Sequence, residues 1–411
     1  MTPLSHLKVL DLSRILAGPW ASQVLGDLGA TVIKIERPDG GDDTRSWGPP
    51  YLCDEHGQPT NESAYYLSAN RNKKSVAVDF TRPEGREIVR RLAAHSDVLL
   101  ENFKAGGLAK YGLDYASLRA INPQLIYCSI TGFGQTGPYA SRPGYDALLQ
   151  AMGGFMSITG GSDETPGAGP QKVGVAVVDL LTGLYGAVGI LAALASREQT
   201  GVGQYIDLAL LDVEVACLAN QGMNYLLTGN SPQRMGNAHP NIVPYQDFPT
   251  SDGAMMVAVG NDGQFQRFCS AIGRPEFATD PDYSTNSARV ANREALLQQI
   301  RAMTTTRTTR DWVCDLQAAN VPCGAVNTVR EVFEDPQVIA RGLRIELDHP
   351  EAGAVPSVAS PLRLSETPVE YRCAPPMLGQ HTAEVLGEAL SLSRSEIADL
   401  AELGIVSCPG L

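Results

Sequence analysis

Asp179 is the residue whose type and surroundings most clearly indicate covalent chemistry. It lies between the apolar stretch VGVAVV and the stretch LLTGLYGAVGILAAL, which together span residues 173–194. This pattern predicts a buried strand or turn that leads into a packed helix, with Asp179 near the helix N-terminus. A carboxylate there is kept ionised by the helix dipole and the free amides, so it can act as a nucleophile. A helix-capping role without chemistry explains the same local sequence, and both interpretations stay open.

A second candidate is the glycine-rich segment YCSITGFGQTGPYASRPGYD, which contains a GxGxxG pattern at Gly132, Gly134 and Gly137. This pattern is typical of dinucleotide sites when a helix begins at the glycines. Here Pro138 and Pro143 follow, which indicates a loop. We therefore expect no nicotinamide cofactor. The glycines would let the loop backbone approach a ligand, although a plain surface loop is an alternative.

Composition narrows the possible classes of protein. The chain has 411 residues, of which 43% are hydrophobic, so it can bury a large core and hold more than one domain. Its 32 basic and 45 acidic residues give a net charge of −13, which disfavours nucleic acid and anionic membranes as partners. The eight cysteines form no CxxC pair and the histidines do not cluster, so we expect no disulfide framework and no metal.

Two features bear on the location of the chain in the cell. Residues 173–194 are apolar enough to resemble a membrane span. Asp179 and the glycines within that stretch favour a packed helix instead, so we expect no span. The first residues, MTPLSHLKVLDLS, show no basic leader before an apolar segment, which predicts a cytoplasmic protein.

Short apolar strands alternate with helical patterns in the first third of the chain. We predict strands over residues 7–13, 31–36, 75–80, 97–102 and 124–130. Helices are expected over ASQVLGDL and over TRPEGREIVRRLAAH, where Thr81 and Glu84 have the spacing of a capping box. The alternation predicts an α/β fold, with a large Rossmann-like domain whose mostly parallel sheet is covered on both faces.

The character of the sequence changes after a long apolar helix. We predict a large α/β domain over 1–200, a linker helix over 201–229, a smaller α+β domain over 230–327, and a linker over 328–411 that returns to the large domain. The smaller domain should hold a hairpin that turns at Asp252 and Gly253, followed by three helices. A second hairpin over LRIELDHPEAGAVPSV and a helix over HTAEVLGEAL are expected in the last segment.

Several segments together resemble the class III coenzyme A transferases of the CaiB/BaiF type. They cover nearly the whole chain and include RILAGPWASQVLGDLGATVIKIERP, GDDTRSWGPP, SANRNKKSVAVDF, ENFKAGGLAKYGL, the glycine-rich segment, VGVAVVDLLTGLYG, RMGNAHPNIVPYQDF and PPMLGQHTAEVL. The strings GDDTR-WGPP and NRNKKS are most similar to the branch that moves CoA from succinyl-CoA to glutarate or a similar short dicarboxylate. The resemblance also implies a homodimer of two interlocked, ring-like subunits, with acyl-CoA and a small carboxylic acid as the substrates.

The resemblance implies a catalytic role for Asp179. Its carboxylate would form a mixed anhydride and then an aspartyl-CoA thioester, so no ATP is required. Tyr145 and Asp146 would lie beside it, and Gly260 and Asn261 in VGNDGQF would shield the intermediate from water. Family members that use oxalate have a more glycine-rich version of that loop and a glutamine at the place of Leu16. Both departures argue against oxalate as the acceptor.

The resemblance also implies sites for the two substrates. Residues that match positions near the nucleotide end of CoA, and that supply local positive charge, are Arg37, Asn70, Arg71, Lys73, Lys74, Asn102, Lys104 and Lys110. Such a charged run is also typical of a solvated face. A second carboxylate on the acceptor would need a cation, because guanidinium groups bind carboxylates through paired hydrogen bonds. The candidates are Arg45, Arg71, Arg142 and His239, although a structural role is favoured for His239 because a single histidine in an apolar neighbourhood is more often structural.

Two alternative functions remain at this stage. A 2-methylacyl-CoA racemase shares the resemblance, but members of that branch have a histidine where this chain has Tyr145. Because a phenol is a weak base at neutral pH, the transferase is favoured. A non-catalytic CoA-binding protein is the alternative from another class, and the presence of Asp179, Tyr145 and the glycine loop together argues against it.

Overall fold

The computed structural model describes residues 2–163 and 165–409, which fall into two compact units. The first unit combines three stretches, up to Phe155, Val173–Leu227 and from Ile339 onward. The second unit is formed by Met156–Lys172 and Thr228–Val338. Met156–Lys172 thus groups with the smaller unit, although we expected it in the large domain.

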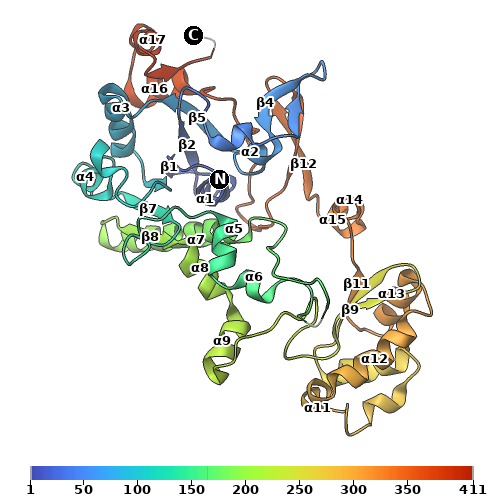
Figure 1. The fold of residues 1–411 in the computed structure, drawn as a ribbon. Helices are drawn as coiled ribbons and strands as arrows, with labels where there is room; N and C mark the ends of the chain where they lie inside the picture. Colours follow the sequence, from blue (N-terminus) through green and yellow to red (C-terminus); the bar gives the residue numbers. More distant parts are fainter. Residues whose placement is uncertain (1, 164, 410–411) are drawn as a thin grey trace. The chain divides into compact units, whose positions relative to one another are not determined.

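A seven-stranded sheet forms the centre of the first unit, in the order β14-β5-β2-β1-β6-β7-β8 (Figure 1). All neighbouring pairs are parallel except β14 with β5. The α/β class with a mostly parallel sheet is therefore confirmed. The strands are β1 (Lys8–Asp11), β2 (Thr31–Glu36), β5 (Lys73–Val78), β6 (Val98–Glu101), β7 (Ile126–Thr131), β8 (Tyr205–Ala209) and β14 (Val406–Ser407).

Helices cover both faces of this sheet. Alternate residues of β1 point to opposite faces, so Val9 joins one apolar cluster and Leu10 joins the other. The cluster of Val9 receives side chains from α1 (Ala17–Asp27) and α7 (Val177–Thr200). Helices on the face of Leu10 are α3 (Pro83–Ala94), α4 (Tyr115–Arg119), α16 (Thr382–Leu390) and α17 (Arg394–Glu402).

The remaining elements of the first unit are short. The expected linker over 201–229 is not one helix, since it contains β8 followed by α8 (Leu210–Cys217) and α9 (Ala219–Thr228). The second predicted hairpin is confirmed as β12 (Arg344–His349) and β13 (Gly353–Val358). Other elements are η1 (Asp43–Ser46), β3 (Tyr51–Cys53), β4 (Pro59–Ser63), α2 (Ala64–Ser68), η2 (Ala109–Tyr111), α5 (Asp146–Met152) and α15 (Pro336–Ala340), the last of which crosses into the second unit.

The predicted capping box before α3 is wrong. The N-cap of this helix is Arg82, because Pro83 takes the first helical position with its fixed φ. Thr81 lies outside the helix, and its amide and hydroxyl both donate to the Asp79 carboxylate at 2.9 and 2.6 Å. The local turn around Asp79 therefore replaces the box.

The surroundings of Asp179 also differ from the expectation. The residues before α7 form no strand, Val175 is exposed, and the helix begins at Val177 after the N-cap Ala176. Asp179 is thus the third helical residue rather than a cap. Among the described residues, α7 is the one helix long and apolar enough to cross a membrane. It packs against α1 and β7, as a core helix of a globular domain does.

The second unit has its own apolar core. Its antiparallel sheet has the order β11-β10-β9, and the predicted hairpin joins β9 to β10. Phe248, Phe268 and Trp312 are buried at the centre of this core. The elements are α6 (Phe155–Ile158), which begins at the boundary, β9 (Tyr245–Pro249), β10 (Ala254–Ala258), α10 (Asp262–Ala271), η3 (Pro275–Ala278), α11 (Asn286–Ala291), α12 (Arg293–Thr304), α13 (Thr309–Ala318), β11 (Cys323–Ala325) and α14 (Val329–Glu334).

Candidate active site

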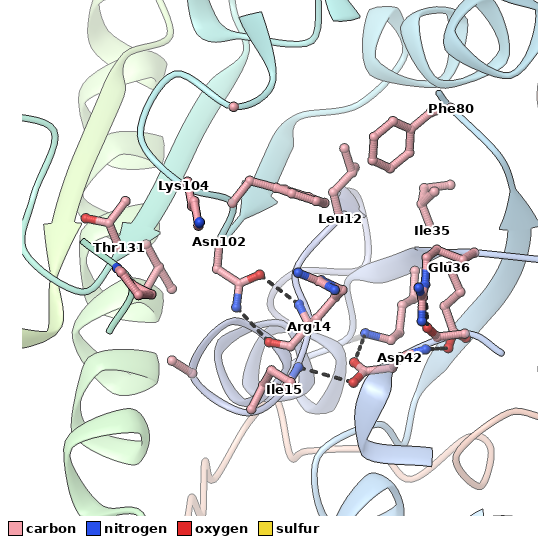
Figure 2. Close-up of a pocket in the computed structure, with 18 of the residues that line it drawn as sticks. Leu12, Arg14, Ile15, Ile35, Glu36, Asp42, Phe80, Asn102, Lys104 and Thr131 are labelled. Carbon is pink, nitrogen blue, oxygen red and sulfur yellow. Dashed lines mark hydrogen bonds and ion pairs between the residues drawn. The ribbon is translucent and has the colours of Figure 1, made fainter. Parts of the chain in front are cut away.

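A cavity of about 800 Å³ opens at the carboxyl ends of the parallel strands in the first unit. Figure 2 shows Leu12 after β1, Glu36 at the end of β2, Asn102 after β6 and Thr131 at the end of β7 around it. The strand order runs outward from β1 in one direction and from β6 in the other. Ligands of open α/β sheets bind at such a reversal, so this cavity is the candidate active site.

The structure brings together candidates from distant parts of the sequence. Asp179 lies at the cavity with Tyr145 and Arg142 from the glycine loop. The other predicted residues that line it are Arg37, Asn102, Lys104 and Lys110. Leu16, at the N-cap of α1, is also in the wall.

The electrostatics of Asp179 differ from the local prediction. Burial and the neighbouring charge of Asp146 raise the pKa of Asp179 to about 7. The backbone amides at the start of α7 do not offset this effect, because they donate to Asp146 instead. The Oδ1 of Asp146 accepts hydrogen bonds from the Val178 and Asp179 N–H groups at 2.8 and 3.3 Å. The carboxylate of Asp179 is therefore less stable in its ionised form than that of an ordinary aspartate.

Asp146 holds the backbone at the start of α7 in place. It is the first residue of α5 and is buried, and its second oxygen accepts from Gln150 Nε2 at 2.6 Å. Through Asp146 the start of α5 is joined to the start of α7. Tyr145 precedes it as the N-cap of α5, and its side chain is 61% exposed.

In the glycine-rich segment, here called the glycine loop, the backbones of Gly132 and Gly144 approach each other closely. A Cβ atom built on Gly132 would lie 2.7 Å from the Cα of Gly144, closer than side chains ever come to backbone. The end of β7 and the start of the return to Tyr145 are thus in direct backbone contact. Gly134 and Gly137 have φ of 87° and 88°, which glycine adopts without strain.

Cationic side chains lie at the cavity in addition to those of the loop. Arg37 is half exposed and pairs with Asp43 at 3.5 Å. Lys110 lies 4.7 Å from the ring centre of Tyr111. Arg14, which the sequence analysis missed, pairs with Asp43 at 2.9 Å, and its buried Nε has no hydrogen-bond partner among the described residues. Arg14 begins the stretch RILAGPW, but nothing in its sequence spacing indicated a role in substrate binding.

Several predicted residues do not line the cavity, and they form ion pairs and hydrogen bonds elsewhere in the fold. Lys73 pairs with Asp11 at 3.3 Å with both side chains fully buried. Burial lowers the pKa of Lys73 to about 7, against the raising effect of Asp11. The others are Asn70, which donates to the Tyr66 carbonyl at 2.8 Å, Arg71, which pairs with Asp27 at 2.6 Å, and Lys74, which pairs with Glu384 at 2.5 Å.

The residues predicted to bind the acceptor also divide into those that line the cavity and those that form ion pairs elsewhere. Arg45 is buried and pairs with Glu36 at 2.8 Å and with Glu62 at 2.7 Å. Arg142 is exposed, lies 3.9 Å from the ring centre of Tyr139, and lines the cavity. Of the three predicted arginines, Arg142 is the one that faces the cavity.

The remaining candidates lie in the second unit. Asn261 is the N-cap of α10, where its side chain accepts from the Gln264 N–H at 2.9 Å. The Gly260 N–H donates to Gln264 Oε1 at 2.7 Å. His239 accepts from the Asn241 N–H at 3.0 Å and lies 5.3 Å from the ring of Tyr245. A role for these residues beside Asp179 stays a prediction.

Two further observations complete the site. Tyr65 was not predicted, yet burial and the charges of Asp179, Asp146 and Asp42 raise its pKa to about 12. In residues 2–163 and 165–409, no group of three or more His, Cys, Asp or Glu side chains has the geometry to hold a metal ion.

Comparison with known proteins identifies relatives over nearly the whole chain. The family described as CoA-transferase family III matches residues 4–382. The succinate–glutarate CoA-transferase of Agrobacterium fabrum is 52% identical over 96% of this chain and 97% of its own length. The succinyl-CoA:glutarate CoA-transferase of Mus musculus is 44% identical over 99% of this chain and 91% of its own.

A solved structure gives the same result for the fold. The crystal structure of a CaiB/BaiF family protein from Brucella suis has a TM-score of 0.82 and 52% identity, and it covers 94% of this chain and 99% of its own. Sequence and fold agree over almost the whole length. The chain therefore belongs to CoA-transferase family III.

Proposed function

We propose that this chain transfers CoA from succinyl-CoA to glutarate, with Asp179 as the nucleophile. The observation that carries the proposal is the position of Asp179, which lies at the start of α7 in a cavity at the carboxyl ends of the sheet. The substrates are those named for relatives that are 44% and 52% identical over nearly the whole chain.

The proposed reaction keeps every intermediate activated. The Asp179 carboxylate attacks the succinyl thioester, and CoA thiolate leaves the mixed anhydride that forms. The thiolate attacks the aspartyl carbonyl, which releases succinate and leaves an aspartyl-CoA thioester. Glutarate then attacks this thioester to form a second anhydride, and the displaced thiolate attacks its glutaryl carbonyl, so that glutaryl-CoA leaves and Asp179 is regenerated.

The electrostatics of the cavity suit this role. A poorly solvated carboxylate is more reactive than one that is paired, and among the described residues no cation stabilises the charge of Asp179. Asp146 keeps the backbone of Asp179 in place while its charge disfavours a second negative charge nearby. Only the ionised form can attack, so transfer depends on the pKa of Asp179.

The cationic residues divide between the two substrates. Arg37, Lys104 and Lys110 supply positive charge for the CoA phosphates at one part of the cavity wall. Arg142 lies three residues before Tyr145 and would bind the distal carboxylate of succinate and glutarate. These local charges would overcome the net charge of −13 of the chain.

The proposal includes the features that family resemblance implies. Gly260 and Asn261 would exclude water from the anhydride, which hydrolyses readily. The chain would act in the cytoplasm as a homodimer. Light scattering should give twice the mass of one chain, and a stable monomer at nanomolar concentration would contradict the interlocked arrangement.

Oxygen labelling tests the reaction most directly. The enzyme is incubated with succinyl-CoA and glutarate labelled with ¹⁸O in its carboxylates, and both products are analysed by mass. In the proposed reaction, one glutarate oxygen stays on Asp179 after each turnover and leaves in the succinate of a later turnover, because the two carboxylate oxygens are equivalent. Labelled succinate and glutaryl-CoA are therefore expected, and Asp179→Ala should form neither.

Other outcomes would contradict the proposal. Glutaryl-CoA formed together with unlabelled succinate would exclude the aspartyl anhydride. If no donor and dicarboxylate react, but a 2-methylacyl-CoA exchanges its α-proton in deuterated water, the chain is a racemase. Binding of CoA without either reaction would show a non-catalytic CoA-binding protein.

A further inference from the structure

The turn between β1 and α1, residues 13–16, forms one wall of the cavity, and the backbone of Ser13, Arg14 and Ile15 is held by side chains. Asn102 Oδ1 accepts from the Arg14 N–H at 2.9 Å, and Asn102 Nδ2 donates to the Arg14 carbonyl at 2.7 Å. On the other side, Asp42 Oδ1 accepts from the Ile15 N–H at 3.2 Å. Figure 2 shows these bonds, with Asn102 and Asp42 on opposite sides of the turn.

Ile15 has an unusual backbone conformation. Its φ is 72°, in the left-handed region that β-branched residues rarely adopt, because the branched side chain crowds the backbone there. Such a conformation is strained and persists only when the surroundings enforce it. Ile15 and its neighbours Arg14 and Leu16 all line the cavity, so the strain lies in the wall of the site.

One of the two supports is itself rigid. The Asp42 side chain is fully buried, and its second oxygen accepts from Lys34 Nζ at 2.9 Å. Burial alone would raise the pKa of Asp42, but the Lys34 ammonium and the amide and hydroxyl of Thr44 lower it to about 2. Lys34 also donates to the Ser13 carbonyl at 2.9 Å, so the start of the turn is fixed from the same point.

Asn102 is the support on the side of β6. It follows the last residue of that strand, Glu101, whose carboxylate accepts from the Phe103 N–H at 2.7 Å. Its side-chain amide pairs with both polar groups of the Arg14 backbone, as a neighbouring strand would. An amide is required for this pairing, since one atom must accept and the other must donate.

We propose that Asn102 is a positioning residue, which holds Ile15 in its left-handed conformation and thereby keeps the 13–16 turn in place against the acyl-CoA. The inference rests on the proposed transfer reaction. Without the Asn102 pairing, Ile15 would relax toward a negative φ, its N–H would leave Asp42, and the wall that carries Arg14 would move. Asn102 acts on the reaction through this turn and not by contact with CoA.

The kinetic test uses a rescue. Asn102→Ala should lower kcat for succinyl-CoA with glutarate by about 10–100-fold, the loss expected when a reacting group shifts by roughly 1 Å, while the KM for succinyl-CoA changes by less than about threefold. Glycine adopts a positive φ without strain. The double variant Asn102→Ala with Ile15→Gly should therefore recover most of the kcat that Ile15→Gly has alone.

A matched control is Asn122→Ala. Asn122 Nδ2 donates to the Ala93 and Ser96 carbonyls at 3.1 and 2.9 Å, and this residue lies before the start of β7, outside the cavity lining. The control loses comparable bonds and should keep the kcat of the wild type. A rise in KM for Asn102→Ala without a fall in kcat, and without rescue, would overturn the proposal in favour of a direct contact with CoA.

Hydrogen exchange separates this inference from the proposed function. The amide at position 15 should exchange slowly in the wild type, at least tenfold faster in Asn102→Ala, and slowly again in the double variant, where Asp42 regains its donor. If the wild type transfers no CoA but exchange follows this order, the proposed reaction fails and the positioning role stands. Unchanged exchange at position 15 in Asn102→Ala overturns the positioning role whatever the enzyme does.

Discussion

Replacing Asp179 by asparagine should stabilise the fold at neutral and basic pH, although it should abolish transfer. The pKa of Asp179 is raised from 3.8 to about 7 by burial and by Asp146. The unfolded chain therefore ionises this group far more readily than the folded chain does. Above pH 7 the folded protein carries a charge that its surroundings disfavour, and Asp179→Asn removes that charge while keeping the shape of the side chain.

The magnitude follows from the size of the pKa difference. Each pKa unit corresponds to about 1.4 kcal/mol, so the rise from 3.8 to about 7 sets an upper limit of about 4 kcal/mol. Asp179 is partly exposed at the cavity, and solvent there reduces the effect. We expect the free energy of unfolding to rise by about 1–3 kcal/mol at pH 8, which should raise the melting temperature by several degrees.

The difference in stability between wild type and Asp179→Asn should change with pH in a defined direction. Because the folded pKa is raised, the folded protein binds more protons than the unfolded chain between about pH 4 and pH 7. The stability of the wild type relative to Asp179→Asn should therefore fall as the pH rises through this window and become constant above it. Melting temperatures of both proteins, measured at equal concentration from pH 5 to pH 8.5, test this directly.

A control of opposite sign is available. The Asp252 carboxylate accepts from the Thr309 N–H, which lowers its pKa. Asp252→Asn should therefore destabilise equally from pH 5 to pH 8.5, and this loss should vanish only below the ordinary aspartate pKa of 3.8. A difference between wild type and Asp179→Asn that does not vary with pH, or a lower stability of Asp179→Asn at pH 8, would refute the argument and show that the start of α7 stabilises the charge.

Three further outcomes are expected. The kcat/KM for transfer should rise with pH and level off above about 7, as Asp179 ionises, and an acid limb near pH 4 would contradict this assignment. Gly132→Ala should cost about 1–3 kcal/mol and lower kcat, because its Cβ meets the Gly144 backbone, whereas Gly324→Ala, with nothing within 4 Å, should have little effect in a thermal melt and a rate assay. Arg142→Ala should raise the KM for glutarate at least tenfold and leave a monocarboxylate such as butyrate unaffected; equal losses for both acids would remove Arg142 from acceptor binding.

Much of the fold could be predicted because its signals are local. The strand at residues 31–36 has the predicted bounds, since the β-branched residues of TVIKIE favour a strand without reference to the rest of the chain. The start of α3 was wrong because two local signals competed there, and Pro83 at the first helical position prevailed over Thr81 as a cap. The start of α7 was wrong because an apolar stretch was interpreted as a strand, although Val175 is exposed.

The site was less predictable because its electrostatics depend on residues far apart in the chain. Lys73 appeared to belong to an exposed basic run, yet its partner Asp11 lies on another strand. Asp146 takes the helix amides that were expected to stabilise Asp179, and the sequence separation between them is 33 residues. Residue types indicated the chemistry, whereas the pairing of charges came from the sheet order.

The core of the first unit is built from segments far apart in the sequence, which has a consequence for folding during synthesis on the ribosome. The cluster under α3 includes Ile405 and Val406, and β14 pairs with β5 at the edge of the sheet, so the first unit lacks part of its core until the last residues have emerged. The core of the second unit runs from Val243 to Val321 without interruption. The nascent chain should therefore fold its middle part first, and the apolar strands of the two earlier stretches of the first unit should stay accessible to chaperones until residues 405–407 have been made.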